Sequence, residues 1–256
     1  MLSRFSLCVA LLALLVASPV HAQSDAEDDL PTIEEKTEGM DQRDGFFPVY
    51  WDDAEGKVWL EIPQMEQEFL YVNSLPVGLG SNDIGLDRGQ LGGERVAYFE
   101  RIGPRVHLVQ PNLDYRADTD NPMEEQAVTD AFAKGVLWGF DVAAEADGRV
   151  LVDATDFIVR DAHGIAQRLQ QTDQGSFSLD KSRSAPFPAN VKAFPQNTEM
   201  EARVTFTGND PGRYVRDVAA NPESFTLRVR HSFVQLPDTD GYTPRRMDPR
   251  SGYFGL

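Results

Sequence analysis

Three pairs of apolar runs, each pair joined by a short polar turn, lie between residues 46 and 154. Apolar runs on both sides of a polar turn are typical of a β-hairpin, and in residues 94–110 apolar and polar positions also alternate, which is the period of a strand with one buried face. We therefore predict three β-hairpins, with the sequences FFPVYWDDAEGKVWLEI (46–62), ERVAYFERIGPRVHLVQ (94–110) and VLWGFDVAAEADGRVLVDA (136–154). Three further strands are predicted from the runs EFLYVNSL (68–75), EARVTFTG (201–208) and SFTLRVRHSFVQL (224–236).

Two segments carry the signals of short helices. Asn121 and Pro122 are typical of an N-cap and a first helical residue, and acidic residues follow them. Thr155–Gln170 has apolar residues near helical spacing, although Gly164 weakens this helix. Gly175–Thr198 is rich in Ser, Pro, Asn and Lys and is predicted to be a long irregular connection. The sum is an α+β fold in which mostly antiparallel β hairpins form a sheet or sandwich, with two short helices.

The N-terminus has the three parts of a secretory signal peptide, residues 1–22. These are Arg4, an apolar run from Phe5 to Val16, and a small-residue exit ending at Ala22. Residues 23–45 are expected to form an acidic flexible lead-in, because they hold few apolar side chains to offset the entropy of ordering. Residues 46–256 then form a single β-rich domain. The protein is expected to be exported, to the periplasm or to the outside of the cell.

The net charge limits the classes of partner, and the cysteine content limits how the fold can be stabilised. The chain carries 24 Lys and Arg against 41 Asp and Glu, a formal net charge of −17. Phosphates would be repelled, so no nucleic-acid partner is expected. The single cysteine, Cys8, lies in the predicted signal peptide, so the mature chain must rely on buried apolar area instead of disulfides. No stable membrane insertion is expected after signal cleavage.

The stretch LGSNDIGLDRGQLGG (79–93) holds five glycines. A phosphate loop needs a lysine, which the stretch lacks, and Asp83 stands where a dinucleotide fingerprint requires its last glycine. Asn82, Asp83 and Asp87 offer oxygen ligands for calcium, but the EF-hand pattern is absent. We expect an interface or structural loop, and its residues are Gly80, Asn82, Asp83, Asp87, Arg88, Gly92 and Gly93.

The sequence motifs that would indicate catalysis or metal binding are weak or absent. The histidines after residue 22 are His107, His163 and His231; none is followed by glutamate, so H-E-x-x-H is absent, and no serine has the glycine spacing of a nucleophile elbow. For His107 and His231 we expect hydrogen-bonded structural roles. We predict no catalytic residue and no cofactor in this chain; weak candidates for metal ligands are Asp83, Asp87, Asp156 and His163.

Acidic residues and a histidine gather in the run VDATDFIVRDAHG (152–164), which could form an acid/base or metal cluster. A local interpretation is favoured. Thr155 is expected to cap a helix, Asp156 to complement the helix dipole, and Asp161 to lie with Arg160 on a solvated face.

Several long strings resemble a known family, large exported bacterial zinc-dependent metalloproteases whose N-terminal part is a domain of unknown function. The strings are SLPVGLGSNDIGLDRGQLGGERV (74–96), LVQPNLDYRA (108–117), VLWGFDV (136–142), VLVDATDFIVRDAHGIAQRL (150–169), KAFPQNTEMEARVTFTG (192–208), HSFVQLP (231–237) and RRMDPRSGYFGL (245–256). The resemblance implies that the zinc-binding helix with H-E-x-x-H and a third histidine lies in a later domain. No catalytic residue is therefore carried over to this chain.

The resemblance favours one function and leaves others open. It implies a non-catalytic accessory domain that packs against its own downstream peptidase domain, with zinc only in that missing domain. The run 251–256 resembles the start of an element that continues in the family, so a truncated version is expected. The alternatives are a stand-alone binding module for peptide or glycan, using Trp51, Tyr98 and Tyr115, and a hydrolase built on residues 153–163.

Overall fold

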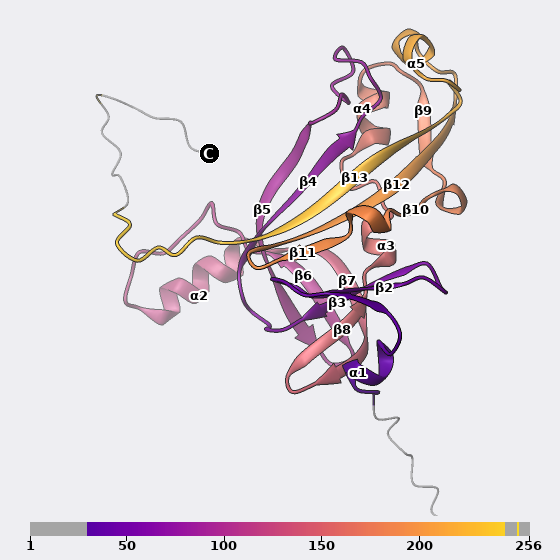
Figure 1. Cartoon of the computed structure of the whole chain (residues 1–256). Coiled ribbons are helices and arrows are strands. Elements are labelled where there is room, and N and C mark those ends of the chain that lie inside the picture. Colours follow the sequence, from indigo (N-terminus) through magenta and orange to yellow (C-terminus); the bar gives the residue numbers. More distant parts are fainter. Residues whose placement is uncertain (1–29, 244–249, 251–256) are drawn as a thin grey trace, which may run out of the picture.

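The computed structural model describes residues 30–243 and residue 250 (Figure 1). The predicted signal peptide and the run 251–256 lie outside the described residues. The described strands form one thirteen-stranded antiparallel sheet. Along its path the order is β1 (Asp41–Arg43), β2 (Val49–Asp52), β3 (Lys57–Ile62), β8 (Arg149–Asp153), β7 (Gly135–Ala146), β6 (Arg105–Gln110), β5 (Leu91–Ile102), β4 (Phe69–Val77), β13 (Ser224–Gln235) and β12 (Asn197–Asn209). Three short strands pair with β12: β9 (Ser176–Leu179), β10 (Ala185–Pro186) and β11 (Lys192–Phe194).

The sheet curls until its two ends meet. The segment after β1 bonds to the β11–β12 end, where Phe46 N donates to Phe194 O over 2.7 Å. Phe47 N donates to Thr198 Oγ1 over 3.0 Å, and that hydroxyl donates back to Phe47 O over 2.8 Å. Because the ends of the path are joined this way, most inward side chains face a common interior.

Four phenylalanines fill that interior. All six pairs among Phe47, Phe69, Phe99 and Phe233 have ring centroids between 4.9 and 6.0 Å apart. Each ring is almost completely buried, and full burial of such a side chain stabilises the fold by about 1.5–3 kcal/mol. The rings come from the segment after β1 and from β4, β5 and β13, so the core ties distant parts of the chain together.

Five short helices complete the described part: α1 (Ile33–Lys36), α2 (Pro122–Ala131), α3 (Thr155–Ile158), α4 (Ile165–Gln171) and α5 (Arg213–Val218). The α+β class, the three hairpins and the helix capped by Asn121 are confirmed. The single helix predicted for Thr155–Gln170 is wrong, because it is divided into α3 and α4. Gly164 stands directly before α4 with φ 76°, a conformation that interrupts a right-handed helix.

Two other predictions need correction. The prediction of a flexible lead-in is wrong for the described part of that segment. Helix α1 begins with a capping box at Thr32, and its Ile33 is buried beside Tyr50 and Trp59. The irregular connection Gly175–Thr198 instead contributes β9, β10 and β11, because the thirteen-residue β12 offers backbone groups along its free side. Helix α5 was not predicted. No helix in the described part is long and apolar enough to cross a membrane.

Candidate functional site

A directed chain of hydrogen bonds runs through the interior, from Arg160 to Tyr71 to His231. Arg160 Nη2 lies 3.0 Å from the Tyr71 hydroxyl, and that hydroxyl lies 2.9 Å from His231 Nδ1. His231 Nε2 lies 3.2 Å from the carbonyl oxygen of Ile158. A carbonyl only accepts, so Nε2 carries the proton, Nδ1 accepts from Tyr71, and the Tyr71 oxygen accepts from Arg160. The Tyr71 hydroxyl and both ring nitrogens of His231 thereby have partners.

The surroundings hold both titratable groups of the chain in their neutral forms. Burial, assisted by the positive charge of Arg160, lowers the pKa of His231 to about 3, and the bond to Ile158 only partly opposes this. Burial also raises the pKa of Tyr71. The guanidinium of Arg160 is held in place by the rings of Phe157 and Trp138, 4.8 and 5.4 Å from its Cζ. The arrangement fixes α3 to β4 and β13.

His163 has a separate partner. Its Nδ1 lies 3.1 Å from Oδ1 of the buried Asn73, and burial lowers the pKa of His163 while the nearby Asp161 opposes the shift. Asp161 itself accepts from Ile165 N and Ala166 N over 2.7 and 2.9 Å, so it caps α4. Asp161 and His163, the two members of the predicted cluster that lie after α3, are thus engaged in structural hydrogen bonds.

The rest of the run 152–164 also has structural roles, with two corrections. Thr155 does not cap α3: its N–H donates to Asp153 Oδ1 over 2.9 Å, and its hydroxyl accepts from Val58 N over 3.0 Å. Arg160 does not lie on a solvated face with Asp161, because it turns inward to Tyr71. Asp156 does lie in the first turn of α3, exposed and paired with Lys181 at 3.1 Å.

The glycine-rich stretch 79–93 inserts apolar side chains into the core. Ile84 and Leu86 are buried, Leu79 N donates to Leu86 O over 2.7 Å, and Arg168 Nε donates to Ile84 O. The polar residues point elsewhere, since Asn82, Asp83 and Arg88 are exposed and Asp87 accepts from the Gln90 amide over 2.8 Å. Gly80 has φ 90°, which favours glycine, and Gly93 O accepts from Arg95.

Gly92 is required for another reason. A Cβ atom at this position would lie 1.9 Å from Oδ1 of Asn73, the atom that bonds to His163. A glycine at 92 therefore permits the buried amide to occupy its place. Among the described residues, no three or more His, Cys, Asp or Glu are grouped so that they could hold a metal ion.

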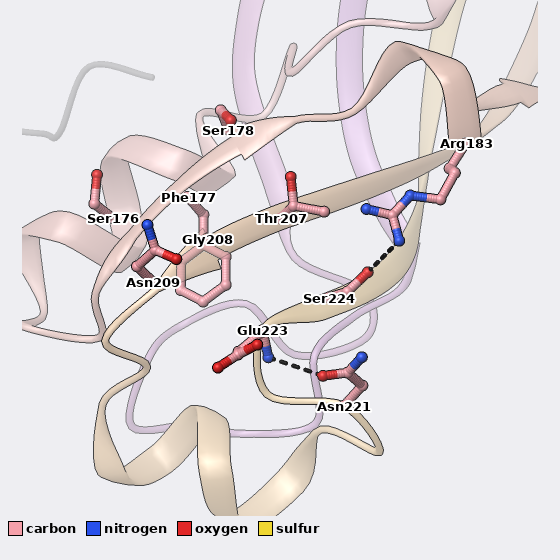
Figure 2. A pocket seen from close by; sticks show the side chains of 10 residues that line it. All are labelled: Ser176, Phe177, Ser178, Arg183, Thr207, Gly208, Asn209, Asn221, Glu223 and Ser224. Atoms are coloured by element: carbon pink, nitrogen blue, oxygen red, sulfur yellow. Dashed lines mark hydrogen bonds between the residues drawn. The ribbon is translucent and has the colours of Figure 1, made fainter.

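Sequence reasoning missed a polar groove of about 580 Å³ on the outer face of the sheet. The strand register aligns Ser178, Thr207 and Ser224 across β9, β12 and β13. Figure 2 shows Arg183 reaching the Ser224 hydroxyl, which accepts a hydrogen bond over 3.1 Å, and Glu223 beyond it. The alternation of polar residues in these strands was the available signal. The unpredicted pairing of β9 with β12 brings the hydroxyls together.

Comparisons place most of the chain in a family. Residues 89–255 match a family model described as a domain of unknown function, DUF5117, and residues 30–78 match a second one, DUF5118. The chain belongs to the DUF5117 family. No curated protein and no solved structure matches it.

The DUF5117 match does not coincide with a separate folding unit. Strand β4 lies in the DUF5118 match, yet it pairs with β5 and β13 of the DUF5117 match on its two sides. The bond from Tyr71 to His231 crosses the same boundary. The two matched segments therefore share one sheet and one core in the described part of the chain.

Proposed function

We propose that this chain is a non-catalytic N-terminal accessory domain of an exported zinc-dependent metallopeptidase-like protein, and that it packs against the peptidase domain. The observation that best supports a non-catalytic role is the structural role of His231. Both of its ring nitrogens are engaged, one by Tyr71 and one by Ile158, inside a closed core. The most buried histidine of the family segment therefore holds the fold together.

Zinc does not fit the described side chains, because no three His, Cys, Asp or Glu among them are grouped as a metal site requires. A zinc ligand needs an imidazole nitrogen with a free lone pair, and both nitrogens of His231 are engaged. Nδ1 of His163 donates to Asn73 Oδ1, which leaves Nε2 free, and His107 lies on β6 opposite Gly139. In the described part of the chain, neither histidine belongs to a group of three or more side chains that could hold a metal ion. No step of peptide hydrolysis is therefore assigned to these residues, and the proposal assigns the metal to another domain.

Two experiments test this function. The purified chain is incubated with Zn²⁺ and an unstructured protein substrate such as casein, and the expected result is no cleavage above the rate without protein. The reading frame after the codon of Leu256 is then sequenced, and it is expected to encode H-E-x-x-H. Cleavage that is lost in a His163→Ala variant would contradict the proposal.

A stand-alone binding module for peptide or glycan is the second candidate. The groove of Figure 2 favours it, because hydroxyl, amide, guanidinium and carboxylate groups line it within reach of one ligand. The aromatic residues first considered do not form one surface: Tyr98 and Tyr115 line a common groove, but Trp51 lies on β2, separated from β5 along the sheet. Saturable glycan or peptide binding that is lost in Thr207→Ala would favour this second function.

A further inference from the structure

The segment between β6 and β7, residues 111–134, forms an arm that stands away from the sheet (Figure 1). It carries α2, and none of the ten residues of α2 is buried. Local side-chain bonds support the helix. Asn121 Oδ1 accepts from Met123 N over 3.1 Å, and Gln126 donates to Asp130 over 2.7 Å.

Such a helix is marginal without a covering surface. An isolated helix shorter than about 12–15 residues gains too little from its own hydrogen bonds to offset the cost of nucleation. In folded proteins an apolar face packed on a neighbour supplies the difference. Helix α2 has no such neighbour in the described part of the chain, so we look for the neighbour outside it.

The arm also presents large apolar side chains to solvent. Met123 is 77% exposed and Tyr115 is 52% exposed. The ring of Tyr115 stacks on Phe132, with centroids 3.7 Å apart and planes 2° from parallel, so the aromatic surface is formed in advance. Together with Tyr98 these rings line a groove of about 560 Å³. Clustered exposed apolar groups of this kind mark interaction surfaces.

The charge of the arm indicates what kind of surface would cover it. The arm contains two basic residues, Arg116 and Lys134. It contains six acidic residues, namely Asp114, Asp118, Asp120, Glu124, Glu125 and Asp130. Lys134 is already paired with Glu100 at 3.1 Å. A partner with an apolar centre and a basic rim complements this distribution, whereas a second acidic arm would repel it.

The strand register places the end of β13 beside the arm. Gln235, the last residue of β13, is aligned with Phe69 on β4, which is aligned with Ala97 on β5. Two strand spacings amount to about 10 Å, and the next residue, Tyr98, lines the groove of the arm. The polypeptide that follows β13 therefore leaves the sheet beside the arm.

We propose that the arm is the docking surface for the adjoining peptidase domain, through an apolar, basic-rimmed face of that domain. This inference rests on the proposed function and adds which part of the chain makes the contact.

The test uses the full chain and, as a separate polypeptide, the domain encoded after the codon of Leu256. Their affinity is measured by calorimetry for the unaltered chain and for Met123→Glu. A glutamate in the first helical turn suits the helix dipole, so this change leaves α2 intact while replacing an exposed apolar side chain of the arm with a charge. Ile102→Glu is the matched control, because Ile102 is 54% exposed but lies at the far end of the β5–β6 hairpin.

The expected result is binding that Met123→Glu weakens at least about tenfold and Ile102→Glu leaves unchanged, with weaker binding at high salt. Hydrogen exchange of the α2 amides is expected to slow in the complex. Binding that is equally strong in both variants would overturn the docking inference and leave the proposed function standing. Complete absence of binding, or a stop codon directly after Leu256, would overturn both. Dimers of the chain that Met123→Glu dissociates would show a second copy on the arm and overturn the inference.

Discussion

The hydroxyl of Tyr71 on β4 donates to Nδ1 of His231 on β13 across 2.9 Å, and 160 positions of sequence separate the two residues. Tyr71 lies in the DUF5118 match and His231 in the DUF5117 match. The bond is continued by Arg160 on one side and by Ile158 on the other. This contact shows how two matched segments with no known function form one folded unit.

Removing the Tyr71 hydroxyl is expected to destabilise the fold. In Tyr71→Phe the buried Nδ1 of His231 loses its donor and Nη2 of Arg160 loses its acceptor, which costs about 1–3 kcal/mol of unfolding free energy. Urea unfolding followed by circular dichroism measures this change. Tyr242→Phe is the control, since Tyr242 is exposed and a surface substitution is expected to change stability by less than about 0.5 kcal/mol. Equal stability of the two variants would contradict the assigned bond.

The pH dependence of stability follows from His231. Its pKa is about 3 in the folded chain and near 6.5 when unfolded, so between these values the unfolded state binds the extra proton. Stability is then expected to fall as pH decreases from about 6.5 towards 3, by up to about 1.4 kcal/mol per pH unit for this group. The lowered pKa of His163 acts in the same direction.

Ring ¹⁵N chemical shifts give a direct reading of this titration. The resonances of His231 are expected to show a neutral ring protonated at Nε2 and to remain unchanged between about pH 7.5 and pH 5. A ring that gains a proton near pH 6.5 would contradict the closed environment. Urea unfolding at the same two pH values supplies the corresponding loss of stability.

Gly92→Ala is expected to disturb the interior although it adds a single methyl group. The new Cβ would lie 1.9 Å from Oδ1 of Asn73 and would displace it from His163, at a cost of about 1–3 kcal/mol. Gly135→Ala is the matched control, because a Cβ there meets nothing within 4 Å. A thermal melt of both variants checks the difference, and a fully stable Gly92→Ala protein would refute the close approach.

A buried carboxylate on the outer side of β12 provides another prediction. Glu201 is fully buried and accepts from Arg230 over 2.5 and 2.8 Å and from Asn190 over 2.9 Å, with Arg228 at 3.4 Å. Glu201→Gln removes the charge that these arginines face and is expected to cost about 1–3 kcal/mol in urea unfolding. The exposed Glu223→Gln serves as the comparison, and equal effects would argue against a stabilising ion pair.

The parts of the fold that could be predicted are those determined by residues close together in the sequence. The hairpin turn at Gly103 and the cap at Asn121 act over a few positions, so their signals are visible in the sequence. The division of α3 from α4 was only partly visible, because Gly164 permits a break but the capping by Asp161 depends on where the backbone turns. Helix α1 was missed because one buried side chain, Ile33, outweighs an acidic composition.

The site residues were harder to predict because their partners lie far away in sequence. His231 was expected to be structural, but neither Tyr71 nor Arg160 could be named as its partner from spacing. The stretch 79–93 was expected to be a loop with glycines for shape, but its last three residues, including Gly92 and Gly93, begin β5. That Gly92 is required by Asn73 became apparent only from the tertiary fold, since the strands must be paired before the amide and the glycine meet.

The most direct test of the account is a calorimetric titration of the purified chain with Zn²⁺ at about pH 7.5, where unshifted histidines are neutral and able to bind metal. Both ring nitrogens of His231 are engaged by Tyr71 and Ile158, and no three His, Cys, Asp or Glu side chains in the described part of the chain are grouped around a common point, so no saturable binding at one equivalent is expected. Stoichiometric zinc binding with submicromolar affinity, lost in His163→Ala or His231→Ala, would contradict the accessory, non-catalytic role.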